Sequence, residues 1–129
     1  MRLAAAIVLA IGMAMPAAAQ LSPGPPGGAA VVWLPRRSAD LQVLDKVNAR
    51  HSVLAVAVGK EARYGTLTIG VASCVVRPAN QPADAAAFLT VTDSNNEGVA
   101  FKGWMVAGQP ALSMLQHPVF DVRVVGCTP

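Results

Sequence analysis

The sequence predicts a small all-β domain, mainly antiparallel, folded as a sandwich or a partly open barrel of about seven strands with one short helix near residues 110–116. From residue 40 onward, short apolar runs alternate with turn-forming residues, which is the pattern of a small all-β fold. Within several runs apolar and polar residues alternate one by one, as they do along a half-buried strand. The chain has 129 residues, which is enough for one modest core.

Four predicted strands make up the first half of the domain. They cover residues 41–47, 52–58, 61–64 and 66–76. Asn48-Ala49 ends the first strand, Gly59-Lys60 ends the second, and Gly65 follows the third, because these residue types favour tight turns. The fourth is the longest of the predicted strands.

Three further strands make up the second half. They cover residues 86–92, 99–106 and 119–125. Residues 78–82 form a loop that is bounded by two prolines. Residues 93–98 are rich in Asp, Asn and Gly, which tolerate left-handed backbone geometry, so we expect a hairpin turn between the first two of these strands.

One segment of the second half has a helical pattern. Pro110 suits the first position of a helix, and Leu112 and Leu115 are spaced so that they share a helix face. Pro118 ends the segment, since the residue before a proline is biased away from helical geometry. The pattern therefore predicts a helix over residues 110–116.

The alternation assigns a face to many side chains. The predicted inward residues are Leu67, Ile69, Val71, Leu89, Val91, Phe120, Val122 and Val124. The predicted outward residues are Thr66, Thr68, Thr90, Thr92, Asp121 and Arg123. The large core candidates are Phe88, Phe101, Trp104 and Phe120. Only 5% of the chain is aromatic, so we expect Val, Leu and Ala to supply most of the core.

The first 19 residues have the layout of a secretory signal peptide. Arg2 supplies the positive charge, residues 3–15 form the apolar segment, and Ala17-Ala18-Ala19 is a small-residue cleavage site before Gln20. We expect cleavage after Ala19 and a periplasmic bacterial protein without a membrane span in the mature chain. An uncleaved membrane anchor is the alternative, although the run is short for a span.

The mature chain divides into a linker and one domain. Residues 20–38 are rich in Pro and Gly and form the linker, and residues 39–129 form a single β domain. An apolar run, residues 31–34, interrupts the linker. It either docks on the domain or contacts a partner.

Size and charge exclude several classes of protein. The chain is too short for a two-domain enzyme or a TIM barrel. Its formal net charge is only +3, and the basic residues are scattered. Nucleic-acid binding needs a concentrated basic surface, so we expect no nucleic-acid partner.

The two cysteines, Cys74 and Cys127, predict one disulfide, because an exported chain meets an oxidising compartment. Closing this long loop stabilises the fold by about 4 kcal/mol in the chain-entropy model. If the strands are regular, Cys74 shares the face of Thr68 and Cys127 that of Arg123. We therefore expect the bond at the polar edge of the domain, tying the last strand to strand 66–76. A redox-active pair is the alternative, but the chain has no CxxC motif.

The residues that could carry chemistry are few, and we assign no catalytic residue, metal ligand or cofactor. His51 and His117 are the only histidines, and no HExxH or GxSxG motif is present. His117 lies at a junction where we expect its ring to cap carbonyl groups. Residues 93–98 resemble the start of a calcium loop, but position 104 is Trp where such a loop needs its closing Glu.

Asp45 and Lys46 are adjacent charges at the end of an apolar strand. Neighbouring side chains of a strand point to opposite faces, so the two cannot pair with each other. We expect one of them to project toward the core and to pair with Arg63 or Arg123.

Several short motifs together resemble a known family. Phe101-x-Gly103-Trp104-Met105 is followed by Pro110-Ala111-Leu112-Ser113, His117-Pro118, Asp121-Val122 and Cys127, and Leu44-Asp45-Lys46-Val47 precedes them. Over about Leu41 to Cys127 they resemble the uncharacterised bacterial family called domain of unknown function 2155. The resemblance implies an exported protein of alphaproteobacterial type and implies no activity. It marks a structural set of residues: Asp45, Lys46, Gly103, Trp104, Met105, Pro110, His117, Pro118 and Asp121.

The leading hypothesis is a non-enzymatic periplasmic β domain that acts as a structural or protein-binding module of the cell envelope. A second hypothesis is a small periplasmic hydrolase or metal-dependent enzyme that uses His117 with Asp121 or Asp45. A third is a carrier of an apolar ligand in the mouth of a barrel. The sequence leans against an enzyme, and it identifies neither the partner nor the oligomeric state.

Overall fold

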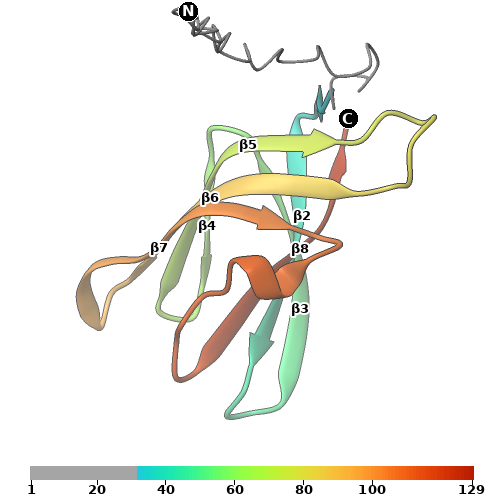
Figure 1. The fold of residues 1–129 in the computed structure, drawn as a ribbon. Helices are drawn as coiled ribbons and strands as arrows, with labels where there is room; N and C mark the ends of the chain where they lie inside the picture. The colour runs from blue at the N-terminus through green and yellow to red at the C-terminus, as the bar shows by residue number, and fades with distance from the viewer. Residues whose placement is uncertain (1–31) are drawn as a thin grey trace, which may run out of the picture.

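The computed structural model describes residues 32–129, apart from the side chain of Glu97 (Figure 1). The predicted signal peptide and most of the predicted linker lie outside the described residues. The strands are β1 (Leu34–Pro35), β2 (Ser38–Asp45), β3 (Arg50–Ala57), β4 (Glu61–Tyr64), β5 (Leu67–Val76), β6 (Ala85–Asp93), β7 (Asn96–Val106) and β8 (Phe120–Thr128). Each of the seven predicted strands corresponds to one of β2–β8, with boundaries shifted by a few residues. No pattern predicted the two-residue β1.

The strands form two antiparallel sheets that pack face to face (Figure 1). The five-stranded sheet has the order β1-β5-β6-β7, and β4 also pairs with β5. The three-stranded sheet has the order β3-β2-β8. The described strands do not close into a barrel, so the predicted mainly antiparallel, sandwich-like fold is confirmed. Within residues 32–129, no helix has the length and hydropathy that crossing a membrane requires.

The predicted helix over residues 110–116 is confirmed only for its first turn. Only Pro110–Leu112 are helical, as the 3-10 turn η1, and Ser113 is already extended, with φ −145° and ψ 112°. Leu115 is buried, whereas Leu112 is 70% exposed, so the two leucines do not share a buried face. A single turn has too few hydrogen bonds to offset the entropy of helix nucleation, and no side chain caps its first residue.

The core lies between the two sheets and consists mainly of Val, Leu and Ala. The predicted inward residues of β5, β6 and β8 are all buried, so the assignment of faces is confirmed. The prediction for the aromatics is only partly right. Phe120 is buried and Phe101 packs against the core, but Trp104 is 45% exposed and stands on the outer face of the five-stranded sheet.

Register explains why Trp104 points outward. In the pairing of β6 with β7, Phe88 lies opposite Trp104, while their neighbours Ala87 and Met105 lie opposite each other. Ala87 and Met105 are buried. Because successive side chains of a strand alternate between faces, Phe88 and Trp104 share the outer face.

A β-bulge in each of two strands turns the cysteines into the core. The register of β5 shifts between Val71 and Ser73, so that Ala72 is an extra residue. Asp40 of β2 pairs with Gly126 of β8, but Leu41, the next residue of β2, pairs with Val124. Val125 is therefore an extra residue of β8. An extra residue reverses the faces of all side chains beyond it.

The disulfide therefore crosses the sandwich. Cys74 of β5 and Cys127 of β8 are bonded, with their Cα atoms 5.9 Å apart, and Cys74 is only 1% exposed. The expected bond between these strands is present. Its expected place at the polar edge is wrong, because that argument assumed regular strands.

The segment before the domain docks on the five-stranded sheet. Leu34 pairs with Val76 and Pro35 with Val75, and the backbone N–H of Arg36 donates to the carbonyl of Cys74 over 2.8 Å. Of the two alternatives for residues 31–34, the structure shows docking for Leu34. Val31 lies outside the described residues.

Candidate functional site

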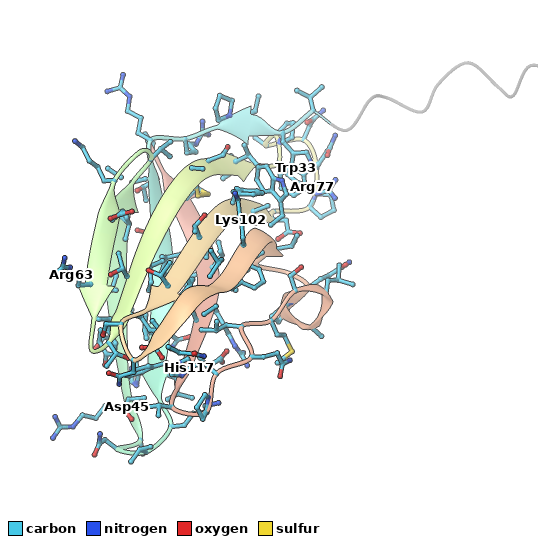
Figure 2. All side chains as sticks on the ribbon, turned by 90° about the vertical axis from the view of Figure 1, so that its left-hand side faces the viewer. Trp33, Asp45, Arg63, Arg77, Lys102 and His117 are labelled. Atoms are coloured by element: carbon cyan, nitrogen blue, oxygen red, sulfur yellow. A yellow bond between two sulfur atoms is a disulfide. The ribbon has the colours of Figure 1, made fainter. Side chains whose placement is uncertain are left out.

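Within residues 32–129, side chains of functional interest gather in two regions, one at each end of the sandwich. Figure 2 shows Asp45 and His117 near one end and Trp33 with Arg77 near the other. The first region is polar and holds the charged residues of the family motif. The second is an aromatic furrow on the outer face of the five-stranded sheet.

In the polar region, both ring nitrogens of His117 have partners. Nε2 lies 2.9 Å from a carboxylate oxygen of Asp93, and Nδ1 accepts the backbone N–H groups of Val119 and Phe120 over 3.1 and 3.0 Å. Since Nδ1 accepts, Nε2 carries the proton and donates it to Asp93. The predicted cap of carbonyl groups is therefore wrong, because the ring caps amides.

Asp93 lies at the end of β6, at the start of the predicted hairpin turn, and its carboxylate has several donors. Besides His117, the backbone N–H of Asn95 donates to it over 3.0 Å. The hydrogen bond from His117, followed by those from Asn95 and Thr66, lowers the pKa of Asp93 from 3.8 to about 2. The side chains of His117 and Asp93 are 7% and 10% exposed, so this contact is closed to most of the solvent.

Aromatic packing fixes the His117 ring from the core side. The ring lies 5.4 Å from that of Phe120, and Phe120 meets Tyr64 edge-on at 5.8 Å. Gly65 has φ +57°, and a Cβ atom there would lie 2.6 Å from the Phe120 ring. Only glycine supplies both this backbone geometry and the space for the ring.

Asp45 and Lys46 hold the turn after β2 against the same loop. The carboxylate of Asp45 accepts the backbone N–H groups of Val47 and Asn48 and the side-chain amide of Asn48. The hydrogen bond from the Asn48 side chain is the main reason why the pKa of Asp45 is lowered. The Lys46 ammonium donates to the carbonyl of His117. The expected pairing of either residue with Arg63 or Arg123 is wrong.

This geometry leaves the enzyme hypothesis without its proposed pair. The structure pairs His117 with Asp93 and not with Asp121 or Asp45, and Asp121 instead contacts Arg123 over 3.2 Å. Among residues 32–129 there is no group of three or more His, Cys, Asp or Glu side chains that could hold a metal ion. The carrier hypothesis placed its ligand in a barrel mouth, and the described strands form an open sandwich instead.

The aromatic furrow lies at the opposite end of the five-stranded sheet. It has a volume of about 390 Å³. Its lining residues are Trp33, Val75, Ala86, Trp104 and Val106. Val75, Ala86 and Val106 come from β5, β6 and β7, where each pairs with the next across the sheet, so these three residues form a continuous apolar floor.

The two tryptophans form the walls of the furrow, and each is held in place. Trp104 meets Phe88 edge-on, with ring centroids 5.6 Å apart. The guanidinium of Arg77 lies 4.7 Å from the centroid of the Trp33 ring, which is within the range of a cation–π contact. The walls are therefore fixed by the chain itself and need no ligand to position them.

Sequence reasoning singled out Trp104 but missed the furrow. Trp104 was assigned to the core, although the run Phe101-x-Gly103-x-Met105 already places the opposite parity inward. That alternation could have moved Trp104 to the surface. No signal in the sequence joins Trp33 and Arg77 to Trp104, because these residues come together only through the pairing of β1, β5, β6 and β7.

The other residues of the structural set lie near these two regions. Gly103 is opposite Leu89 in the sheet, and Met105 is buried beside it. Pro110 begins η1, and Pro118 directly follows His117 in the loop before β8. These positions pack or shape the chain, and none of them brings a reactive group to a cavity.

Comparison with known proteins gives a family and no activity. Residues 39–127 match the family model described as "Uncharacterized protein conserved in bacteria (DUF2155)". "Uncharacterized protein RP359" of Rickettsia prowazekii (strain Madrid E) is 27% identical over 89 residues. That alignment covers 65% of this chain and 56% of the relative, so the chain spans little more than half the length of the curated relative that it matches. No solved structure matches the chain. Because the family model covers more than half of the sequence, the chain belongs to the bacterial DUF2155 family.

Proposed function

We propose that this protein is a non-enzymatic, protein-binding module of the bacterial cell envelope, and that the furrow between Trp33 and Trp104 is its contact surface. Two features support an envelope location. The N-terminal sequence has the layout of an export signal, and the single pair of cysteines forms a disulfide, which persists mainly in oxidising compartments.

The observation that carries the proposal is the pair of tryptophans on the outer face of the five-stranded sheet. Tryptophan is enriched at the energetic centres of protein interfaces, because it buries a large apolar area with little loss of conformational entropy. Here two of them frame an apolar floor that is already formed. The ionisable residues of the family motif, by contrast, all contact their own chain.

The proposal is tested by site-specific photo-crosslinking in the protein's own host. A photoreactive residue replaces Lys102, which is exposed and lies two positions before Trp104 on the same strand face. The control replaces Val53, which is 65% exposed on the outer face of the three-stranded sheet. We expect a discrete protein adduct from position 102 and none from position 53.

A second variant separates binding from folding. Trp104→Ala should remove the adduct at position 102 while the protein stays folded, with a melting temperature lowered by no more than about 8 °C, because the indole stands on the outer face of the sheet and is 45% exposed. An adduct that forms equally from both positions, or that persists in Trp104→Ala, would contradict the proposal.

A further inference from the structure

Resting on the proposed function, we infer that the furrow binds a proline-containing peptide segment in the polyproline II conformation, with an acidic residue beside its prolines. The shape of the furrow, the hydrogen bonding of its floor and the charges at its rim together favour such a segment.

The shape favours a single chain over a flat surface. Ala86, at the centre of the floor, is 5% exposed because its neighbours cover it, so the accessible lining of this shallow furrow consists of the two indoles and of Val75 and Val106. A bilayer contacts side chains that protrude, whereas a shallow furrow between two flat rings accepts a narrow apolar group. A proline ring is such a group, and aromatic-lined grooves recognise proline-rich segments in this way.

The floor of the furrow offers few backbone groups to a ligand. Val75 lies between β1 and β6, and Ala86 lies between β5 and β7, so each of these two residues has a paired strand on both sides. Val106 lies on the edge strand β7, and its carbonyl accepts the backbone N–H of Gln109, so strand addition would take place at the outer edge of β7 and not on the floor. A polyproline II segment suits such a floor, because its backbone is solvated and makes no internal hydrogen bonds. The indole N–H groups of the walls are the donors that can reach its carbonyls.

The positive charges at the rim of the furrow favour an acidic residue in the bound peptide. Arg77 lies against Trp33, and Lys102 stands on the same strand face as Trp104, so a cation flanks each wall. Figure 2 shows Lys102 on the same part of the molecule as Trp33 and Arg77. Two described acids lie toward this side of the sheet. Glu61 of β4 is separated from Lys102 by β5 and β6, and Asp84, two residues before Ala86, has its carboxylate bound by the backbone N–H groups of Ala85 and Gly108.

The chain carries its own probe for the test. It has two tryptophans, and both line the furrow. Intrinsic fluorescence therefore reports on the furrow alone. The titrant is a synthetic eight-residue peptide of Pro and Glu, added to the full mature chain. We expect saturable binding with a dissociation constant of about 10–100 μM, roughly the weak range of peptide recognition.

Variants and altered peptides locate the contacts. Replacing the prolines of the peptide by Ala, or Trp104→Ala in the protein, should weaken binding at least about tenfold, or about 1.4 kcal/mol. Lys102→Glu should weaken binding of the Pro/Glu peptide similarly. This variant should bind a peptide with Lys in place of Glu more tightly than the Pro/Glu peptide. Arg63→Glu is the charge-matched control, because Arg63 lies on β4 opposite Thr68, away from the furrow, and its binding should stay as in the unaltered protein.

A triple variant without three prolines of the chain, P23A/P25A/P26A, gives one further supporting outcome. If this variant binds the peptide more tightly than the unaltered chain, these prolines compete with the peptide for the furrow, which supports recognition of proline.

Two results would overturn the inference. One is equal binding of the proline and alanine peptides, or no binding of either. The other is a fluorescence change with anionic phosphatidylglycerol vesicles and none with the peptide, which would assign the furrow to a membrane surface. If the photo-crosslink at position 102 still forms, the proposed function stands and only the peptide chemistry is wrong.

Discussion

At the scale of single residues, His117 shows how a motif that looks catalytic can be structural. Its ring has a carboxylate on one side, two amides on the other and the Phe120 ring against its face. Lys46 binds its carbonyl as well. These contacts join the end of β6, the turn after β2 and the loop before β8.

His117→Ala should therefore lower stability. The substitution leaves two backbone N–H groups and the Asp93 carboxylate without their partner, and we expect a loss of about 2 kcal/mol in the free energy of unfolding. The measurement is urea unfolding followed by circular dichroism. His51→Ala is the matched control, because the other histidine is exposed on β3, and it should change the free energy by less than about 0.5 kcal/mol.

Asp93 makes the stability depend on pH in the acid range. Its pKa is about 2 in the folded protein against a usual 3.8, so the carboxylate stabilises the folded state fully above about pH 4, and this contribution is lost as the pH falls toward 2. Thermal melts between pH 2 and 6 should show this loss. In Asp93→Asn the melting temperature should depend less on pH in this range. Asp121→Asn, which removes the partner of exposed Arg123, should keep the pH dependence of the unaltered protein.

Gly65 separates backbone strain from steric overlap. Gly65→Ala forces a side chain into positive φ and against the Phe120 ring, and we expect it to cost about 2–4 kcal/mol. Gly59 also has positive φ, at +82°, but a Cβ there meets nothing within 4 Å. Gly59→Ala should therefore cost only about 1 kcal/mol, for the backbone alone. Equal losses in chemical denaturation would show that the ring contact is unimportant.

These residues also mark the limit of sequence reasoning at the site. The motif drew attention to Asp45, Lys46 and His117, but it assigned none of their partners. Asp93 and His117 are 24 positions apart, and they meet only because the β6–β7 hairpin end lies beside the loop before β8. A contact set by tertiary packing leaves no periodicity in the chain.

At the scale of elements, alternation predicted most of the strands and faces but failed where a strand gains a residue. Ala72, the extra residue of β5, has no glycine or proline directly beside it. Val125, the extra residue of β8, is followed by Gly126, and a glycine inside a strand often marks a bulge. Simple alternation therefore placed both cysteines on the wrong face, and Gly126 was the signal that could have corrected Cys127. The helix predicted over 110–116 is limited to the turn Pro110–Leu112, because two leucines at helical spacing are too few to determine the length of a helix.

The two faces of the five-stranded sheet should respond differently to truncation. Leu89 is completely buried, so Leu89→Ala should lower the free energy of unfolding by about 3 kcal/mol. Trp104 lies on the outer face of the same sheet and is 45% exposed. Trp104→Ala should therefore lower the free energy of unfolding by about 1 kcal/mol or less, although its side chain is larger than that of Leu89. Chemical denaturation of both variants checks this order. A larger loss for Trp104→Ala would place the indole in the core.

At the scale of the whole molecule, one covalent bond joins the two sheets. Cys74 belongs to the five-stranded sheet and Cys127 to the three-stranded sheet, and the bond closes a loop with a sequence separation of 53. A domain of this size has a total stability of about 5–15 kcal/mol. The bond is therefore a large part of what keeps the sheets together.

Replacing both cysteines measures this contribution. Cys74→Ala with Cys127→Ala should lower the free energy of unfolding by about 4 kcal/mol from the loop entropy alone. Urea unfolding of the oxidised protein and of the double variant gives the difference. The same titration with reductant is the control, and it should bring the unaltered protein close to the double variant while leaving the variant as it was.

The overall architecture could be predicted from simple sequence patterns, whereas the polar region and the furrow could not. Regular spacing of apolar runs and turn residues was enough to predict an antiparallel sandwich. The furrow depends on which strands are neighbours, since Trp33 reaches Trp104 only across β5 and β6. Strand order is a property of the folded whole and is not written in any local segment.

The two bulges make the disulfide depend on the alignment of β5 and β8. The two sulfur atoms meet only when both bulges have formed, because a strand that slips by one residue carries its cysteine to the opposite surface of the sheet. A misaligned chain thus leaves exposed thiols, which remain open to exchange, while a correctly aligned chain hides them in a bond. The disulfide therefore requires the native register of both β5 and β8.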